Sequence, residues 1–115
     1  MEYLYKIDVT QLSEPSNTRL VQSIVNLASD AGNCSVTYVR TPAGSGSKAG
    51  LHSHTFDQMF YLLSGIMNVE IAGKEYYAEP GTLIIFPAGI PHRNWNLGPD
   101  PNTYLSFKIG IGGSE

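Results

Sequence analysis

The chain has 115 residues, of which 42% are hydrophobic, a size that suits one domain with a real core and excludes two. Seven Lys and Arg against ten Asp and Glu give a net charge of −3 at pH 7 without any basic cluster, so nucleic acid is not expected as a partner. No apolar run is long enough to cross a membrane, so no membrane partner is expected either.

The beginning of the chain and its cysteine content favour a reducing compartment. Residues 1–6 lack the charged start and the apolar stretch of a signal peptide. Cys34 is the only cysteine, so no disulfide can form within the chain. We therefore expect a cytoplasmic protein.

In the first part of the chain, short strand-forming segments alternate with turn signals. Residues 3–9 alternate enough to form an edge strand, and a loop with Pro15 follows them. Residues 20–28 fit both a helical period and a strand, and their β-branched side chains favour the strand. Residues 34–40 are predicted as the next strand, before a loop rich in glycine and serine over residues 42–50.

The second part of the chain continues this pattern to the end. Strands are predicted at residues 59–63, 66–71, 76–77, 82–86 and 103–109, with tight turns such as Ser64-Gly65 between them. In the last strand Leu105, Phe107 and Ile109 are expected to point inward and Lys108 outward. Many short strands with regular turns and no internal repeat predict a single all-β domain over residues 1–115, either a small barrel or a double-sheet jelly roll.

Three histidines, the only ones in the chain, gather in its central stretch. His52 and His54 are two residues apart, so on a strand both would leave the same face, and Gln58 keeps that even spacing. His92 would come from a neighbouring strand. Since neutral imidazole is the commonest metal ligand, the pattern predicts a metal site with three histidines.

These segments resemble the two motifs of the cupin superfamily, G-x5-H-x-H-x3-E-x6-G and G-x5-P-x-G-x2-H-x3-N. The first corresponds to residues 46–65 and the second to residues 81–96. The matching positions are Gly46, His52, His54, Gly65, Gly81, Pro87, Gly89, His92 and Asn96. The resemblance implies a double-stranded β-helix, the jelly-roll barrel of the cupins, and one divalent metal ion, whether Zn, Fe, Ni, Mn or Co.

Gln58 stands where the family usually has a glutamate ligand. It is predicted either to bind the metal through its side-chain oxygen or to hold a bound water by a hydrogen bond. Asp57 is expected to face away from the histidines because of its odd position. A glutamine in place of a carboxylate leaves the metal more positive, which favours Lewis-acid chemistry and disfavours higher oxidation states.

Other residues are candidates for the pocket around the metal. Tyr38 and Arg40 share the parity of Val36 and would project into the barrel mouth, where an arginine would bind a substrate carboxylate; the alternative for Arg40 is an exposed salt bridge. Tyr38, or a metal-bound hydroxide, would serve as general base. Asn94 and Asn96 are expected to be structural. The predicted apolar lining is Phe60, Leu62, Leu105 and Phe107.

The predicted function is metal-dependent chemistry on a small molecule. The favoured activity is that of an isomerase, cyclase or lyase acting on a small carbonyl or carboxylate compound. A dioxygenase with a three-histidine centre is the alternative enzyme, and a non-catalytic module that binds a sugar or an organic acid is the alternative of another class. A homodimer paired partly through residues 3–9 is also predicted, because an aromatic edge strand needs a cover.

Overall fold

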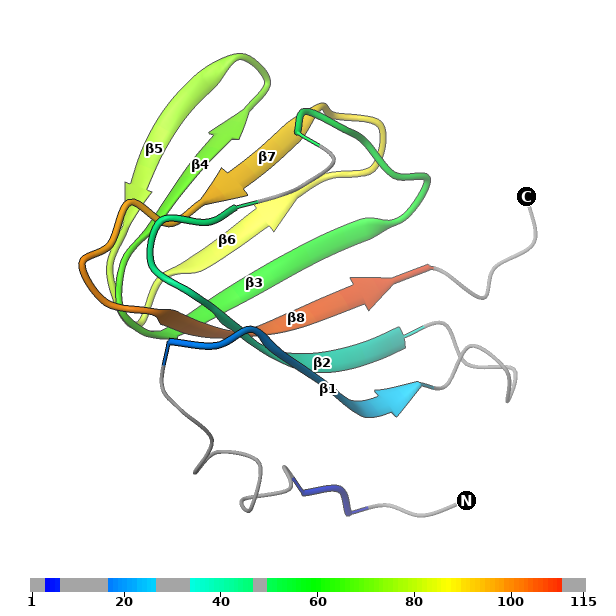
Figure 1. Ribbon diagram of the computed structural model, residues 1–115. Coiled ribbons are helices and arrows are strands. Elements are labelled where there is room, and N and C mark those ends of the chain that lie inside the picture. The colour runs from blue at the N-terminus through cyan, green and yellow to red at the C-terminus, as the bar shows by residue number, and fades with distance from the viewer. Residues whose placement is uncertain (1–3, 7–16, 27–33, 47–49, 111–115) are drawn as a thin grey trace.

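The computed structural model describes residues 4–6, 17–26, 34–46 and 50–110. Within these ranges the chain forms strands connected by turns, and no helix. The strands, labelled in Figure 1, are β1 (Leu20–Asn26), β2 (Cys34–Thr41), β3 (Asp57–Ser64), β4 (Met67–Ile71), β5 (Lys74–Ala78), β6 (Leu83–Phe86), β7 (His92–Trp95) and β8 (Asn102–Ile109). The described residues therefore contain no helix that could span a membrane.

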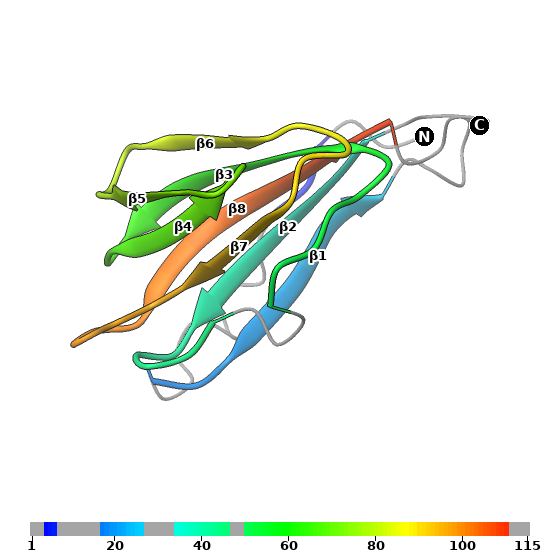
Figure 2. The ribbon, with the colours of Figure 1, turned by 90° about the horizontal axis from the view of Figure 1, so that it is seen from above.

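The strands form two antiparallel sheets. One sheet has the order β1-β2-β8-β3-β6 and the other has the order β5-β4-β7. Seen from above, β1 and β6 lie at opposite edges of the larger sheet (Figure 2). The prediction of an all-β jelly roll is confirmed.

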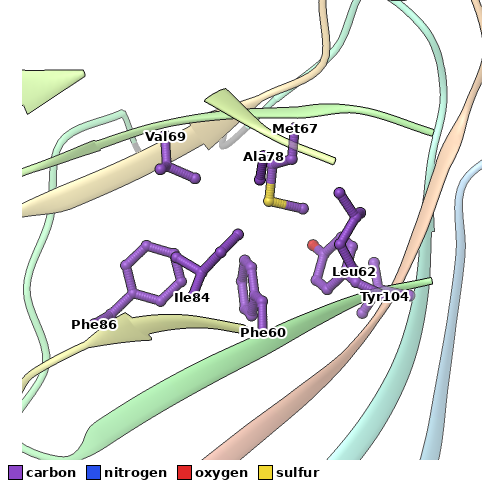
Figure 3. Close-up of a cluster of buried hydrophobic side chains, with 9 residues drawn as sticks. Phe60, Leu62, Met67, Val69, Ala78, Ile84, Phe86 and Tyr104 are labelled. Atoms are coloured by element: carbon purple, nitrogen blue, oxygen red, sulfur yellow. The ribbon is translucent and has the colours of Figure 1, made fainter. Parts of the chain in front are cut away.

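The core lies between the two sheets because each contributes its inward-facing apolar side chains. Met67, Val69 and Ala78 from the smaller sheet face Phe60 and the other buried residues of the larger sheet (Figure 3). The rings of Phe60 and Phe86 meet edge to face with centroids 4.8 Å apart, a favourable arrangement for aromatic pairs. This cluster closes the interior beside the histidines.

The turn between β3 and β4 depends on Gly65. Its φ of +76° is in the left-handed region, which glycine enters without steric cost. A Cβ built on Gly65 would lie 2.5 Å from the carbonyl oxygen of Pro101 and 2.8 Å from the Cα of Asn102. The Asn102 Nδ2 also donates to the carbonyl oxygen of Ile66 at 2.8 Å, so the turn and the start of β8 are held tightly together.

The predicted strands agree with the described ones, except that the predicted edge strand at residues 3–9 falls mostly outside the described residues. The ambiguous segment at residues 20–28 is a strand as far as Asn26. Most of the predicted edge strand at residues 3–9 lies outside the described residues, and residues 4–6 are not in a strand. Pairing of two chains through this segment stays a prediction.

The predicted faces of β2 and β8 were wrong. Tyr104 and Ser106 pair with Leu62 and Phe60, and directly paired residues of an antiparallel ladder share a face. Tyr104 and Ser106 therefore point inward, whereas Leu105 and Phe107 lie on the outer face. The prediction assumed that apolar residues mark the interior, but here the interior also carries a polar site.

The same argument corrects the prediction for β2. Val39 and Thr41 pair with Tyr104 and Asn102, so they share the inner face. Tyr38 and Arg40 consequently lie on the opposite face, where the Arg40 side chain is buried and donates to Thr18. Among the described residues, Arg40 thus forms neither the barrel-mouth contact nor the exposed salt bridge considered from sequence.

Candidate metal centre

The three histidines converge although two of them lie outside regular strands. His52 forms an isolated bridge with His92, the first residue of β7, through backbone hydrogen bonds of 2.7 and 2.9 Å. His54 follows in an irregular segment, since β3 begins only at Asp57. The predicted common strand face is therefore replaced by one bridge, which still holds the segments of His52 and His92 side by side.

The arrangement of the rings fits a metal ion. One nitrogen of each histidine lies within 4.8 Å of the others. Two nitrogens bound to one ion at about 2.1 Å are at most about 4.2 Å apart, so the rings would draw closer together around an ion. The Nδ1 atoms of His52 and His92 lie 2.7 Å and 3.2 Å from the carbonyl oxygens of Gly50 and Ile90. As Nδ1–H donors to these oxygens, both rings keep an unprotonated Nε2 for an ion.

Gln58 completes the donor set as a buried neutral residue. Its side chain is 7% exposed and lines the same hollow as the three histidines. The Nε2 atom donates to the Ser106 hydroxyl at 3.1 Å, which leaves the side-chain oxygen available for an ion. Asp57 is exposed and accepts a hydrogen bond from the Ala88 backbone at 2.9 Å, so it faces away as predicted.

The hollow beside the histidines has a volume of about 280 Å³, at the lower end of the range for small-molecule pockets. Phe60 lines it as predicted, whereas Leu62 packs in the core. Tyr38, Arg40, Leu105 and Phe107 do not line it. Its full lining is Arg19, Thr41, Gly46, His52, His54, Gln58, Phe60, His92, Asn94 and Tyr104.

Four polar residues of this lining were missed as pocket residues in the sequence. Arg19 immediately precedes β1, Thr41 ends β2, Asn94 is in β7 and Tyr104 is in β8. Burial raises the pKa of the Tyr104 phenol, and the side chains of Thr41 and Asn94 and the charge of Arg19 oppose this only in part. The phenol is therefore protonated at neutral pH and can donate a hydrogen bond into the hollow.

Asn96 has the structural role expected of it. Its Nδ2 donates to the carbonyl oxygens of Thr41, Pro42 and Asp100, and its Oδ1 accepts from the Gly98 backbone at 2.8 Å. These bonds tie the end of β7 to the end of β2. Both strands carry pocket residues, so Asn96 supports the site from outside it.

Comparison with known proteins gives the family. A model of the cupin domain matches residues 38–108, which is more than half of the chain and includes all three histidines. The chain is a cupin. No curated protein sequence matches it.

Solved structures of similar fold agree with this family. An RmlC-like cupin from Methanocaldococcus jannaschii with a double-stranded β-helix superposes with a TM-score of 0.75 at 14% identity, covering 97% of this cupin and 94% of that chain. A Streptococcus pyogenes protein of unknown function superposes with a TM-score of 0.72 at 24% identity, covering 95% of this cupin and 90% of that chain. A predicted oxalate decarboxylase from Thermotoga maritima superposes with a TM-score of 0.71 at 20% identity, covering 84% of this cupin and 94% of that chain. These likenesses show the fold.

Two of the three histidines of this cupin, His54 and His92, resist protonation in the metal-free state. Burial, followed by the nearby His52, His92 and Lys108, lowers the pKa of His54. Burial also lowers the pKa of His92, with a further contribution from His52, although the hydrogen bond to Ile90 raises it. Since a metal binds the neutral ring, both effects favour the form that an ion requires.

We expect the metal-free cupin to lose stability as the pH falls from about 7.5 to about 5.5. The ordinary histidine pKa is 6.5, and those of His54 and His92 are lowered in the folded chain. The unfolded chain therefore takes up protons first, so acidification favours unfolding. Thermal unfolding of chelator-treated protein across this pH range measures the effect.

The variant His54→Asn is the control for this pH dependence. It removes one of the two rings with a lowered pKa, so its unfolding temperature is expected to fall less over the same range. The chain has only three histidines, which keeps the background titration small. An unfolding temperature of the parent protein that is constant or rises on acidification would contradict the expectation.

Proposed function

We propose that this cupin is a metal-dependent enzyme that performs isomerase, cyclase or lyase chemistry on a small carbonyl or carboxylate compound. His52, His54 and His92 would hold one divalent ion, with the oxygen of Gln58 as the fourth donor. Zn, Fe, Ni, Mn and Co all suit donors of this kind. A bound ion would act as a Lewis acid that polarises a substrate oxygen.

The observation that carries this proposal is the neutral donor set. Within the described residues no Asp or Glu lines the hollow, and the nearby Asp57 is bonded to Ala88 instead. Four neutral donors leave the charge of a divalent ion undiminished, which strengthens Lewis-acid catalysis and opposes oxidation of the ion. Proton shifts, cyclisation and ring opening beside a carbonyl use this property.

The remaining residues of the hollow would orient the substrate and support developing charge. The protonated phenol of Tyr104 can donate a hydrogen bond to an oxygen that becomes negative during reaction. Asn94 offers an amide on the same wall, and Phe60 forms an apolar side that limits water. The small hollow favours a compact substrate, in line with the Thermotoga maritima protein of the same fold, a predicted oxalate decarboxylase.

We expect activity on the true substrate to survive strict exclusion of oxygen and to be supported by zinc, which has no redox chemistry. Replacing Gln58 by Glu should retain the metal and lower the rate by about 10- to 100-fold, because the restored anion weakens the Lewis acid. A substrate screen with and without oxygen, on protein of known metal content, provides the measurement. Asp57→Asn is the matched control, since it changes a carboxylate that faces away from the site.

The alternative functions give different results in the same screen. Turnover that consumes oxygen stoichiometrically would favour a dioxygenase with a three-histidine centre. Specific binding of a sugar or an organic acid, with no turnover under either condition, would favour a binding module. A Gln58→Glu variant that is as fast as the parent would contradict the proposal that the neutral donor set strengthens the Lewis acid.

A further inference from the structure

Two positively charged side chains, the exposed Arg19 and the half-buried Lys108, lie beside the hollow of the histidines without a compensating carboxylate in its lining. Arg19 lines the hollow of the histidines and also an adjoining hollow of about 230 Å³, which Lys108 borders. Of the described residues, no Asp or Glu lines either hollow, and neither Arg19 nor Lys108 is in an ion pair. The chain as a whole has a charge of −3, so the positive charge beside the two hollows is a local feature.

The backbone that carries Arg19 is fixed by its neighbours. The buried Arg40 donates from Nε to the Thr18 carbonyl oxygen and from Nη2 to the Thr18 hydroxyl, both at 2.9 Å. The side-chain oxygen of Asn17 accepts from the Ala43 backbone, also at 2.9 Å. Both residues directly before Arg19 are thus bound to β2 and the loop after it. Arg40, for which the sequence left open a place in the barrel mouth or an exposed salt bridge, instead holds the residue before Arg19.

A buried hydroxyl on the same wall has no partner. Thr41 is 2% exposed and lines the hollow together with Arg19, and its Oγ1 forms no hydrogen bond within the described residues. Burial raises the pKa of the Tyr104 phenol, and Thr41 is close enough to that group to oppose part of the rise. An oxygen atom in the hollow next to Thr41 would give this buried hydroxyl a partner, which is favourable because an unpaired buried polar group is costly.

We propose that Arg19 binds the carboxylate of the substrate, with Thr41 and Tyr104 as hydrogen-bonding partners, so that the substrate is a compact organic acid with a second oxygen facing the histidines. Only the placement of the second oxygen at the histidines rests on the proposed function; the binding of the carboxylate by Arg19 does not. A guanidinium pairs with a carboxylate through two parallel hydrogen bonds. Phosphate is disfavoured because the described chain offers the hollow no helix N-terminus of the kind that binds phosphate groups.

The test is calorimetric binding to the zinc-loaded full chain, with 4-oxopentanoate and succinate as the acids and methyl 4-oxopentanoate as the uncharged probe. We expect the acids to bind the parent protein more tightly than the ester. Arg19→Gln should weaken both acids by about 10- to 100-fold and leave the ester unchanged, since it removes a charge-assisted pair. Arg19→Lys should recover part of the affinity. Lys74→Gln, which removes a positive charge from an exposed hairpin, should bind like the parent.

Several outcomes would overturn this assignment. These are acids that fail to bind the parent protein, an Arg19→Gln variant with parental affinity for them, an equal loss for acid and ester, or tighter binding of inorganic phosphate than of either acid. Metal content and the unfolding temperature of Arg19→Gln are measured alongside, and both should equal those of the parent. Acids that bind through Arg19 in a protein that turns over nothing would refute the proposed function and leave the carboxylate site standing.

Discussion

Replacing His54 by alanine is expected to abolish stable metal binding while leaving the fold intact. His54 supplies one of three converging nitrogens, and even the loss of a partner outside the ligand set costs metal sites about 10- to 100-fold in affinity. Its ring stacks on Phe56 at 4.6 Å but lies outside the strands and the core cluster. The bond from the Gly89 backbone goes to the His54 carbonyl oxygen, which alanine retains.

The measurement is elemental analysis after loading with zinc and dialysis, with an unfolding curve for each protein. Ser53→Ala is the matched control, because Ser53 is exposed between the two histidines and contributes no ligand. The parent and Ser53→Ala should each hold one ion per chain. If His54→Ala holds the same metal at the same stoichiometry, the binding site lies elsewhere. His92→Ala is a less informative variant because His92 is buried and packs on Phe86 at 4.4 Å, so it also tests stability.

The fold and the grouping of the three histidines were readable from the sequence because both depend on local, fixed spacings. Turn residues divide the chain at the positions where the strands end, as Ala72-Gly73 does between β4 and β5. The histidines occupy motif positions whose spacing tolerates little change. The exact geometry was less readable, since His52 and His54 converge through a single bridge to His92 and not along a regular strand.

The inner faces of β2 and β8 could not be assigned from alternation alone. In β8 both faces are plausible interiors, because Tyr104 and Ser106 alternate with Leu105 and Phe107. The choice is made by pairing with β3, where the apolar Phe60 and Leu62 are unambiguously buried. The inner face of β8 has to match the inner face of the strand beside it. That this strand is β3 is known only from the sheet topology and not from the sequence.

Arg19 was missed for a related reason. It lies at the boundary of a segment whose pattern fits both helix and strand, so its direction is undefined locally. The pairing of Leu20 with Arg40 starts the β1–β2 ladder and sets the side to which Arg19 points. This contact joins residues that are 20 positions apart. The arginine that lines the hollow is Arg19, and not the Arg40 that was considered from the sequence.

Replacing Gly65 by alanine is expected to destabilise the fold more than the same change at Gly73. Both glycines have a positive φ, +76° and +83°, so both variants pay about 1–2 kcal/mol for the left-handed backbone. Only at Gly65 does the new Cβ collide with backbone, at 2.5 Å from Pro101 and 2.8 Å from Asn102. Overpacking of this kind adds about 1–3 kcal/mol, which brings the cost at Gly65 to about 2–5 kcal/mol.

Urea unfolding of the parent, Gly65→Ala and Gly73→Ala proteins separates the cost of the left-handed backbone from the cost of the collision. The Cβ added at Gly73 has no atom within 4 Å, so that variant reports the cost of the backbone alone. The neighbouring Ala72 already adopts a φ of +53°, which shows that this hairpin accepts a left-handed alanine. An excess cost at Gly65 means that the start of β8 cannot move away from the turn. Equal costs for the two variants would show that Asn102 shifts easily, and the tight joint between β3, β4 and β8 would then not be what holds Tyr104 in the site.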